Sequence, residues 1–163
     1  MSTQKCYLKI MPKKIEFNFK SPNESPGYLL GQLTLLWQRK QKKVLDPLDL
    51  TQTQFALLCA LAWLSNNSNN VTQIDIANQT NFDRMMVSKV LRTLEEKKFV
   101  TRQEHEIDTR AKTIRLTNIG EKVLQKAVIE IENADSVFFV SLDIKLEQFN
   151  KNMVQLIDKN KTE

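Results

Sequence analysis

Residues 72–96 have the sequence TQIDIANQTNFDRMMVSKVLRTLEE, which predicts two short helices separated by a tight turn. Thr72 can cap the first helix, and Asp75 stands three residues later, at the position that completes a capping box. Asp83 ends the turn that follows and can cap a second helix, which we expect over residues 84–97. The pattern is therefore that of a helix-turn-helix.

The second of these helices has two chemically different faces. Apolar side chains recur at helical spacing on one side, which predicts that this side packs against a core. These are Met86, Val87, Val90, Leu91 and Leu94. The opposite side carries Arg84, Met85, Ser88, Lys89 and Arg92. Arginine, lysine and hydroxyl side chains on a free helix are suited to the edges of bases in the major groove, which is wide enough for one helix. The same residues also fit an ordinary solvated helix face.

Two β-type runs follow, residues 99–104 and 112–116, and they predict a hairpin. A hairpin beside a helix-turn-helix forms a wing, and the tip of this one contains Asp108 and Arg110. An arginine there can enter the adjacent minor groove, where narrow A·T-rich DNA concentrates negative potential. Flanking phosphates can be neutralised by Arg102 and Lys112, on the two strands, and by Lys98, just before them.

Further helices are expected on both sides of this unit. Ser25-Pro26 predicts the start of a helix that ends before Pro47, and Thr51 with Gln54 forms a second capping box. Two more helices are expected over about 118–139 and 142–158. We predict a mainly α fold with a small β wing, in which residues 1–24 form a basic, extended arm. With only 3 glycines and 4 prolines there is little room for tight turns.

Composition excludes several classes of protein. The net charge is +5, and the first 45 residues hold nine basic and two acidic side chains. No apolar run approaches the roughly 18 residues that cross a bilayer, and the N-terminus lacks a signal-peptide core, so we expect a cytoplasmic protein. Cys6 and Cys59 form no CxxC motif, and His105 has no Cys or His at ligand spacing. We therefore predict neither a metal site nor a cofactor.

Four fragments together resemble the MarR (multiple antibiotic resistance regulator) family of transcription factors. They are TQIDIA at 72–77, VSKVLRTLE at 87–95, DTR at 108–110 and LTNIG at 116–120. The resemblance covers about residues 27–160 and implies an obligate homodimer whose winged lobes bind two palindromic half-sites. It also implies that Asp108 orients Arg110 for its contact with the minor groove. Lys98 departs from the family pattern, because many relatives have glycine after the recognition helix. Either the helix ends with Lys98 in a left-handed conformation, which costs about 1 kcal/mol relative to glycine, or it ends differently.

The resemblance also implies how the chain is divided. Residues 25–160 would form a single domain, with a winged-helix lobe over 50–117 and a helical dimerisation region made by 25–45 and 118–160. The family often holds an effector between the two regions. Tyr28, Trp37 and Trp63 can line such a pocket for a small aromatic or amphipathic molecule, or they can simply pack in the core.

These observations predict a homodimeric regulator that binds palindromic double-stranded DNA, most often as a repressor, with no membrane partner. The alternative is a winged-helix module that binds proteins without sequence-specific DNA binding, which the modest excess of two positive charges over 72–117 leaves open. We expect no enzyme activity, because the chain has one histidine, no phosphate-binding glycine loop and no nucleophile-base pair.

Overall fold

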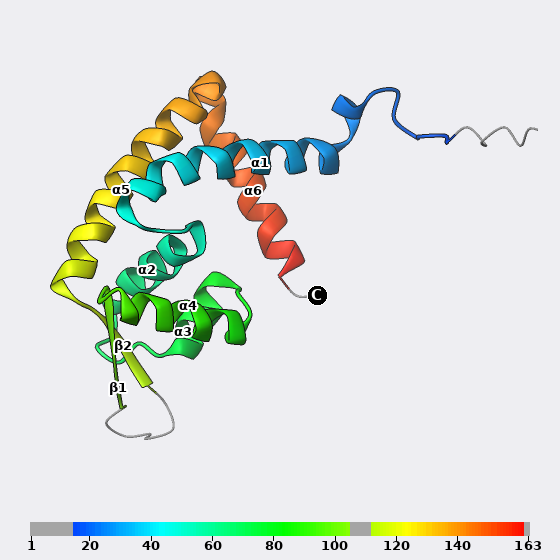
Figure 1. Ribbon diagram of the computed structural model, residues 1–163. Coiled ribbons are helices and arrows are strands. Elements are labelled where there is room, and N and C mark those ends of the chain that lie inside the picture. Colours follow the sequence, from blue (N-terminus) through cyan, green and yellow to red (C-terminus); the bar gives the residue numbers. More distant parts are fainter. Residues whose placement is uncertain (1–14, 105–111, 162–163) are drawn as a thin grey trace, which may run out of the picture. The chain divides into compact units, whose positions relative to one another are not determined.

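The computed structural model describes residues 15–104 and 112–161 (Figure 1). Its elements are η1 (Pro22–Glu24), α1 (Pro26–Leu45), η2 (Asp46–Leu48), α2 (Gln52–Ser65), α3 (Gln73–Thr80), α4 (Arg84–Glu96), β1 (Val100–Glu104), β2 (Lys112–Leu116), α5 (Asn118–Phe138), η3 (Val140–Lys145) and α6 (Leu146–Asn160). The predicted class, mainly α with a small β wing, is confirmed. The chain divides within α1 into two compact units, residues 1–35 and 36–163.

The predicted starts of α2 and α3 are confirmed by their hydrogen bonds. Thr51 Oγ1 accepts from the Gln54 N–H at 3.2 Å, and Gln54 Oε1 accepts from the Thr51 N–H at 3.1 Å. Thr72 and Asp75 exchange the equivalent pair at 3.3 and 2.9 Å. Each capping box satisfies two backbone donors that the first turn of a helix leaves without partners.

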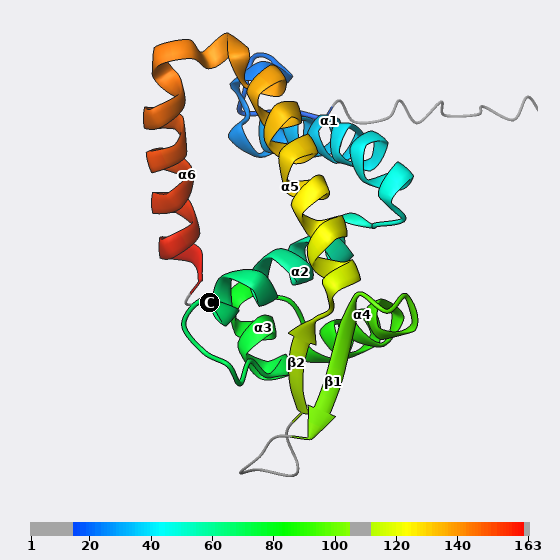
Figure 2. The same cartoon turned by 90° about the vertical axis from the view of Figure 1, so that its left-hand side faces the viewer.

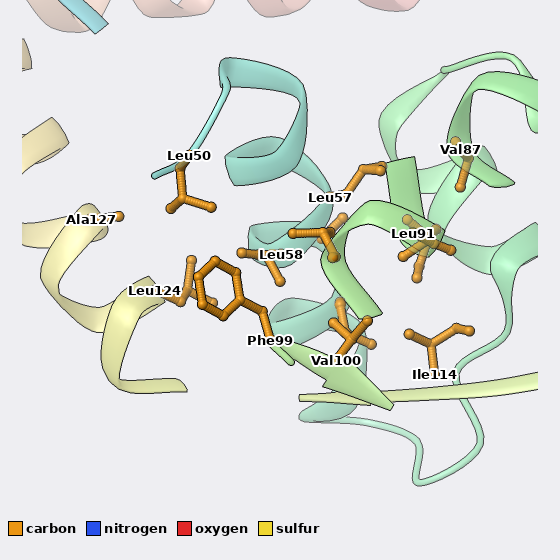
Figure 3. Packing of buried hydrophobic residues seen from close by; sticks show 14 of the residues in the cluster. Leu50, Leu57, Leu58, Val87, Leu91, Phe99, Val100, Ile114, Leu124 and Ala127 are labelled. Atoms are coloured by element: carbon orange, nitrogen blue, oxygen red, sulfur yellow. The ribbon is translucent and has the colours of Figure 1, made fainter. Parts of the chain in front are cut away.

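The core of the second unit lies between α2, α4, the hairpin and α5 (Figure 3). Its fully covered side chains include Leu57, Leu58, Leu61, Val87, Leu91, Leu94, Val100 and Ile114. Leu124 and Ala127 extend the same cluster along α5. Burying each leucine contributes about 1.5–3 kcal/mol, so this cluster is the main source of stability for the lobe and fixes it to the first half of α5.

The hairpin is tied to the helix-turn-helix at its base. β1 and β2 pair antiparallel, with Val100 opposite Leu116 and Glu104 opposite Lys112. The Ile114 N–H donates to the Val71 carbonyl at 2.8 Å, just before α3 begins. The base of the wing therefore has a fixed position relative to α3.

α5 ends where the sequence predicts, at Phe138, but the start of α6 differs from the prediction. The sequence pattern places the last helix from residue 142, whereas α6 begins at Leu146. Asp143 has φ 45° and ψ −126°, a conformation that interrupts a helix, and residues 140–145 form short 3₁₀ turns instead. Figures 1 and 2 show α6 turning back from the end of α5. None of the helices in the described ranges is long and apolar enough to cross a membrane.

Candidate nucleic-acid interface

The turn between α3 and α4 is built by two polar side chains. Asn81 ends α3 with φ 54°, a left-handed conformation that asparagine tolerates well. Asp83 then caps α4, since its Oδ1 accepts from the N–H groups of Met85 and Met86 at 2.9 and 3.1 Å. Gln73 adds a link across the turn by donating to the Arg84 carbonyl at 3.4 Å. The N-terminal end of α4 is thereby fixed on α3.

The structure brings the predicted recognition residues of α4 together on one face. Arg84, Met85, Lys89 and Arg92 are exposed, and Ser88 is half-buried among them. Met85 is the most open, at 82% exposure, whereas Val87, Leu91 and Leu94 on the opposite face are fully covered. Within residues 15–104 and 112–161, no carboxylate pairs with the cations of this face. Met86, expected on the packed side, is 38% exposed.

The basic residues of the wing have different surroundings. Lys112 is exposed on β2, and so is Arg115, which the sequence reasoning did not single out. The Arg102 side chain is only 13% exposed, and its Nη1 lies 3.9 Å from Glu95 Oε2. Its Nε is buried and has no hydrogen-bond partner in the described part of the chain. Arg102 thus faces the end of α4 rather than open solvent. Asp108 and Arg110 lie outside the described residues.

The C-terminal end of α4 shows how the chain accommodates Lys98. Lys98 takes φ 61°, its N–H donates to the Glu95 carbonyl, and the Phe99 N–H donates to the Leu94 carbonyl, both at 2.9 Å. This is a Schellman motif, in which glycine is the usual left-handed residue. Lysine there costs about 1 kcal/mol relative to glycine. Of the two endings that the sequence leaves open, the structure has the left-handed one.

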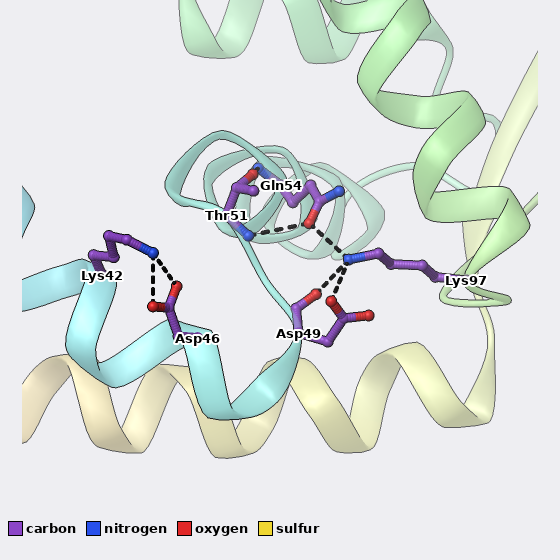
Figure 4. Close-up of polar contacts among 6 residues, drawn as sticks. All are labelled: Lys42, Asp46, Asp49, Thr51, Gln54 and Lys97. Carbon is purple, nitrogen blue, oxygen red and sulfur yellow. Dashed lines mark hydrogen bonds and ion pairs between the residues drawn. The ribbon is translucent and has the colours of Figure 1, made fainter.

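Lys97 is a residue that the sequence reasoning missed. Its ammonium lies 2.5 Å from the Asp49 carbonyl oxygen, 3.0 Å from Asp49 Oδ1 and 3.3 Å from Gln54 Oε1 (Figure 4). One signal was available, because Lys97 follows the buried Leu94 by three residues and Val90 by seven, which places it near the packed side of the helix. Its adjacent neighbour, Lys98, is exposed.

The three aromatic residues considered for an effector pocket lie in different settings. Tyr28 lines a cavity of about 390 Å³ with Phe17 and Phe19. Trp37 packs against Phe138, with ring centroids 5.2 Å apart. Trp63 is 68% exposed.

A separate cavity of about 600 Å³ lies between the end of α2 and the first half of α5. Its lining includes Ala62, Leu116, Lys122, Leu124 and Val128, and none of the three aromatic candidates.

Cys59, on α2, has a neutral thiol at physiological pH, because burial raises the pKa of this thiol to about 11. Cys6 and His105 lie outside the described residues.

The proteins to which this chain is similar agree with a winged helix-turn-helix. Residues 46–135 match the family described as ArnR1-like, winged-helix domain. Over 139 residues the chain is 39% identical to the uncharacterized HTH-type transcriptional regulator YdcH of Bacillus subtilis (strain 168), a match that covers 85% of this chain and 94% of that protein. MepR of S. aureus, solved in complex with DNA, has a TM-score of 0.75 and 26% identity, covering 83% of this chain and 98% of its own.

The chain belongs to the MarR family of winged-helix transcriptional regulators. The resemblance found in four sequence fragments is thereby confirmed. A MarR variant from E. coli, solved with operator DNA, shares the fold at a TM-score of 0.73 and 19% identity, covering 80% of this chain and 92% of its own. In this MarR-family protein, α4 is the second helix of the helix-turn-helix and the hairpin is the wing.

Proposed function

We propose that this MarR-family protein binds a specific operator through the exposed face of α4. The observation that carries the proposal is the contrast between the two sides of this helix. One side is fully covered by the core, and the other presents Arg84, Met85, Lys89 and Arg92 without a neutralising carboxylate in the described part of the chain. Arginine and lysine bind guanine edges, and Ser88 can contact either base of a pair.

The wing supplies a second contact in this proposal. The Ile114 N–H donates to the Val71 carbonyl, which holds the described strands of the hairpin beside the start of α3. Arg110 enters the minor groove, oriented by Asp108, in the role that the family resemblance implies. Lys112 and Arg115, both exposed on β2, lie on the flanking phosphates.

The proposed operator is palindromic because the protein acts as a homodimer. α6 is amphipathic, yet no residue of this 15-residue helix is buried in the single chain. Val154, Leu156 and Ile157 are 52–64% exposed. Contiguous exposed apolar surface of this kind marks an interface, and a second copy would cover it. The two recognition helices would then lie about 34 Å apart, one turn of DNA.

The regulator is proposed to be a repressor that leaves its operator when it binds a small molecule. A change in the separation of the two recognition helices lowers affinity without any contact to DNA. The cavity between α2 and α5 has apolar walls and is also lined by Glu121 and Lys122, which suits a small aromatic or amphipathic molecule. Titration with aromatic carboxylates, followed by operator release and by tryptophan fluorescence, tests this part. Unchanged operator affinity across such compounds would contradict it.

The test of operator binding is selection of bound duplexes from a random pool, followed by titration of the enriched sites across a range of salt. We expect an enriched palindrome with half-sites about 10 base pairs apart and a steep fall of affinity with salt. Sedimentation of the free protein should give a dimer. Flat, non-specific binding would instead favour a winged-helix module that binds other proteins.

A further inference from the structure

Lys97 joins two parts of the chain that are far apart in sequence. It is the C-cap residue of α4, and the nearest of its acceptors is the carbonyl of Asp49, 48 residues earlier. A lysine ammonium has three donor hydrogens. Here three oxygens surround it, at 2.5, 3.0 and 3.3 Å, and its side chain is only 22% exposed. Two of these oxygens, the Asp49 carbonyl and Gln54 Oε1, accept hydrogen bonds from the ammonium, and Asp49 Oδ1 forms an ion pair with it.

Two of the oxygens that receive Lys97, Gln54 Oε1 and the Asp49 carbonyl, are held in place, whereas the Asp49 carboxylate is 80% exposed. Gln54 is buried, and its Oε1 also accepts from the Thr51 N–H as part of the capping box of α2. Asp49 takes a left-handed conformation with φ 53°, and its N–H donates to the Asp46 carbonyl at 3.1 Å. The joint between α1 and α2, residues 45–54, is therefore an ordered receptor for the ammonium.

A second lysine at the same joint provides a contrast. Lys42 pairs with Asp46 at 2.7 Å, but both side chains are more than half exposed and belong to one local segment (Figure 4). Such exposed pairs contribute little. Lys97 is the one of the two that links the joint to another helix, so the two lysines form a matched pair for experiment.

The orientation of α4 depends on how its two ends are held. Asp83 and Gln73 hold its N-terminal end on α3. At the C-terminal end, Lys97 binds the joint that continues directly into α1 through the fully buried Leu45. In the proposed dimer α1 belongs to the dimerisation region, so a movement of this joint would be transmitted to the recognition helix.

We infer that Lys97 is a positioning residue for operator recognition, which acts through Asp49 and Gln54 and makes no contact with DNA. The inference rests on the proposed operator binding and adds the element that connects the dimerisation region to α4. It predicts that removal of the ammonium lowers sequence discrimination and leaves the general attraction to DNA unchanged. A phosphate-binding lysine would show the opposite behaviour.

The test compares Lys97→Met, Lys97→Arg, Asp49→Asn and the control Lys42→Met. Dissociation constants are measured for the selected operator and for an unrelated duplex of equal length, across salt, at a temperature where circular dichroism shows each variant folded. We expect Lys97→Met to weaken operator binding by about ten-fold, with the unrelated duplex and the salt slope unchanged. Lys97→Arg should recover most of the loss, and Lys42→Met should match the wild type.

Asp49→Asn removes only the negative charge, because asparagine also tolerates the left-handed conformation at this position. We therefore expect a smaller loss of operator affinity than for Lys97→Met. Combined with Lys97→Met it should add nothing further, because both changes remove one interaction. If Lys97→Met does not fold, the binding of Asp49→Asn to the operator and to the unrelated duplex tests the inference. An unchanged ratio of operator to unrelated binding in both variants would overturn the inference, and so would an equal loss on both duplexes with a salt slope lower by about one. Failure of the proposed function is a separate result, in which the wild type prefers no duplex.

Discussion

Gly120 lies directly against the backbone of Phe99. A β-carbon at position 120 would stand 2.8 Å from the Phe99 carbonyl carbon and nearer still to its oxygen. Thr117 reinforces this contact, because its N–H donates to the Phe99 carbonyl and its Oγ1 accepts from the Gly120 N–H, both at 3.0 Å. The first turn of α5 therefore packs directly against the backbone segment that connects α4 to the wing.

Gly120→Ala should lower the free energy of unfolding by about 1–3 kcal/mol, because backbone rather than a flexible side chain occupies the space that the methyl group needs. Urea denaturation at matched protein concentration measures the change. Gly27→Ala is the control, since a β-carbon there meets nothing within 4 Å. That variant should be neutral or slightly more stable. Equal midpoints for Gly120→Ala and the wild type would contradict the prediction.

Lys98→Gly should raise the free energy of unfolding by about 1 kcal/mol, because it removes the steric cost of a β-carbon at φ 61°. Thermal or urea unfolding detects a difference of this size. The same substitution at Lys122, an exposed position within α5, should be destabilising by about 1 kcal/mol. Opposite signs at the two lysines identify the backbone conformation as the cause, whereas a loss at both would count against it.

Arg92→Ala should change which operator sequences are preferred, with about 1–3 kcal/mol less discrimination at the base pair it contacts. Ser88→Ala should act in the same way with a smaller effect. Competition with randomised duplexes measures the preference. Lys112→Ala, which removes a proposed phosphate contact, should weaken all duplexes alike and lower the salt slope by about one. An unaltered preferred sequence for both α4 variants would exclude them from base recognition.

Arg110→Ala should weaken operator binding while the dimer stays intact, because the arginine belongs to the proposed wing tip and not to the proposed dimer interface. Titration at fixed salt measures the affinity, and sedimentation checks the assembly. The loss should be largest for operators with an A·T-rich segment beside the half-site, where the minor groove is narrow. Affinity equal to the wild type on such a duplex would reject the minor-groove role.

Cys59 should resist thiol reagents, since burial raises its pKa to about 11 and the thiolate is the reactive form. In a Cys6→Ser variant, the alkylation rate with iodoacetamide should be slow at pH 7 and rise up to about pH 11. In the unfolded chain the thiol ionises at lower pH, so its contribution to stability is full below about pH 9 and is lost as the pH rises to about 11. Rapid alkylation of the folded protein at pH 7 would contradict this.

The local structure was predictable because the interactions behind it span only a few residues. The capping boxes of Thr51 and Thr72 each join positions three apart, and the apolar periodicity of α4 shows which side is covered. The positions of Arg84, Lys89 and Arg92 on one exposed face followed from that periodicity alone. Patterns of this range also carried the family resemblance, and with it the expected wing.

Tertiary packing decided what the pattern left open. Adjacent lysines have the same chemistry, yet Lys98 takes the left-handed position of the turn and Lys97 is held by Asp49, because the end of α4 meets a joint distant in sequence at Lys97 only. Arg102 faces Glu95 because the pairing of β1 with β2 sets the side on which it lies. Such contacts depend on how separate elements pack together, and in the case of Lys97 and Asp49 the partners are 48 residues apart.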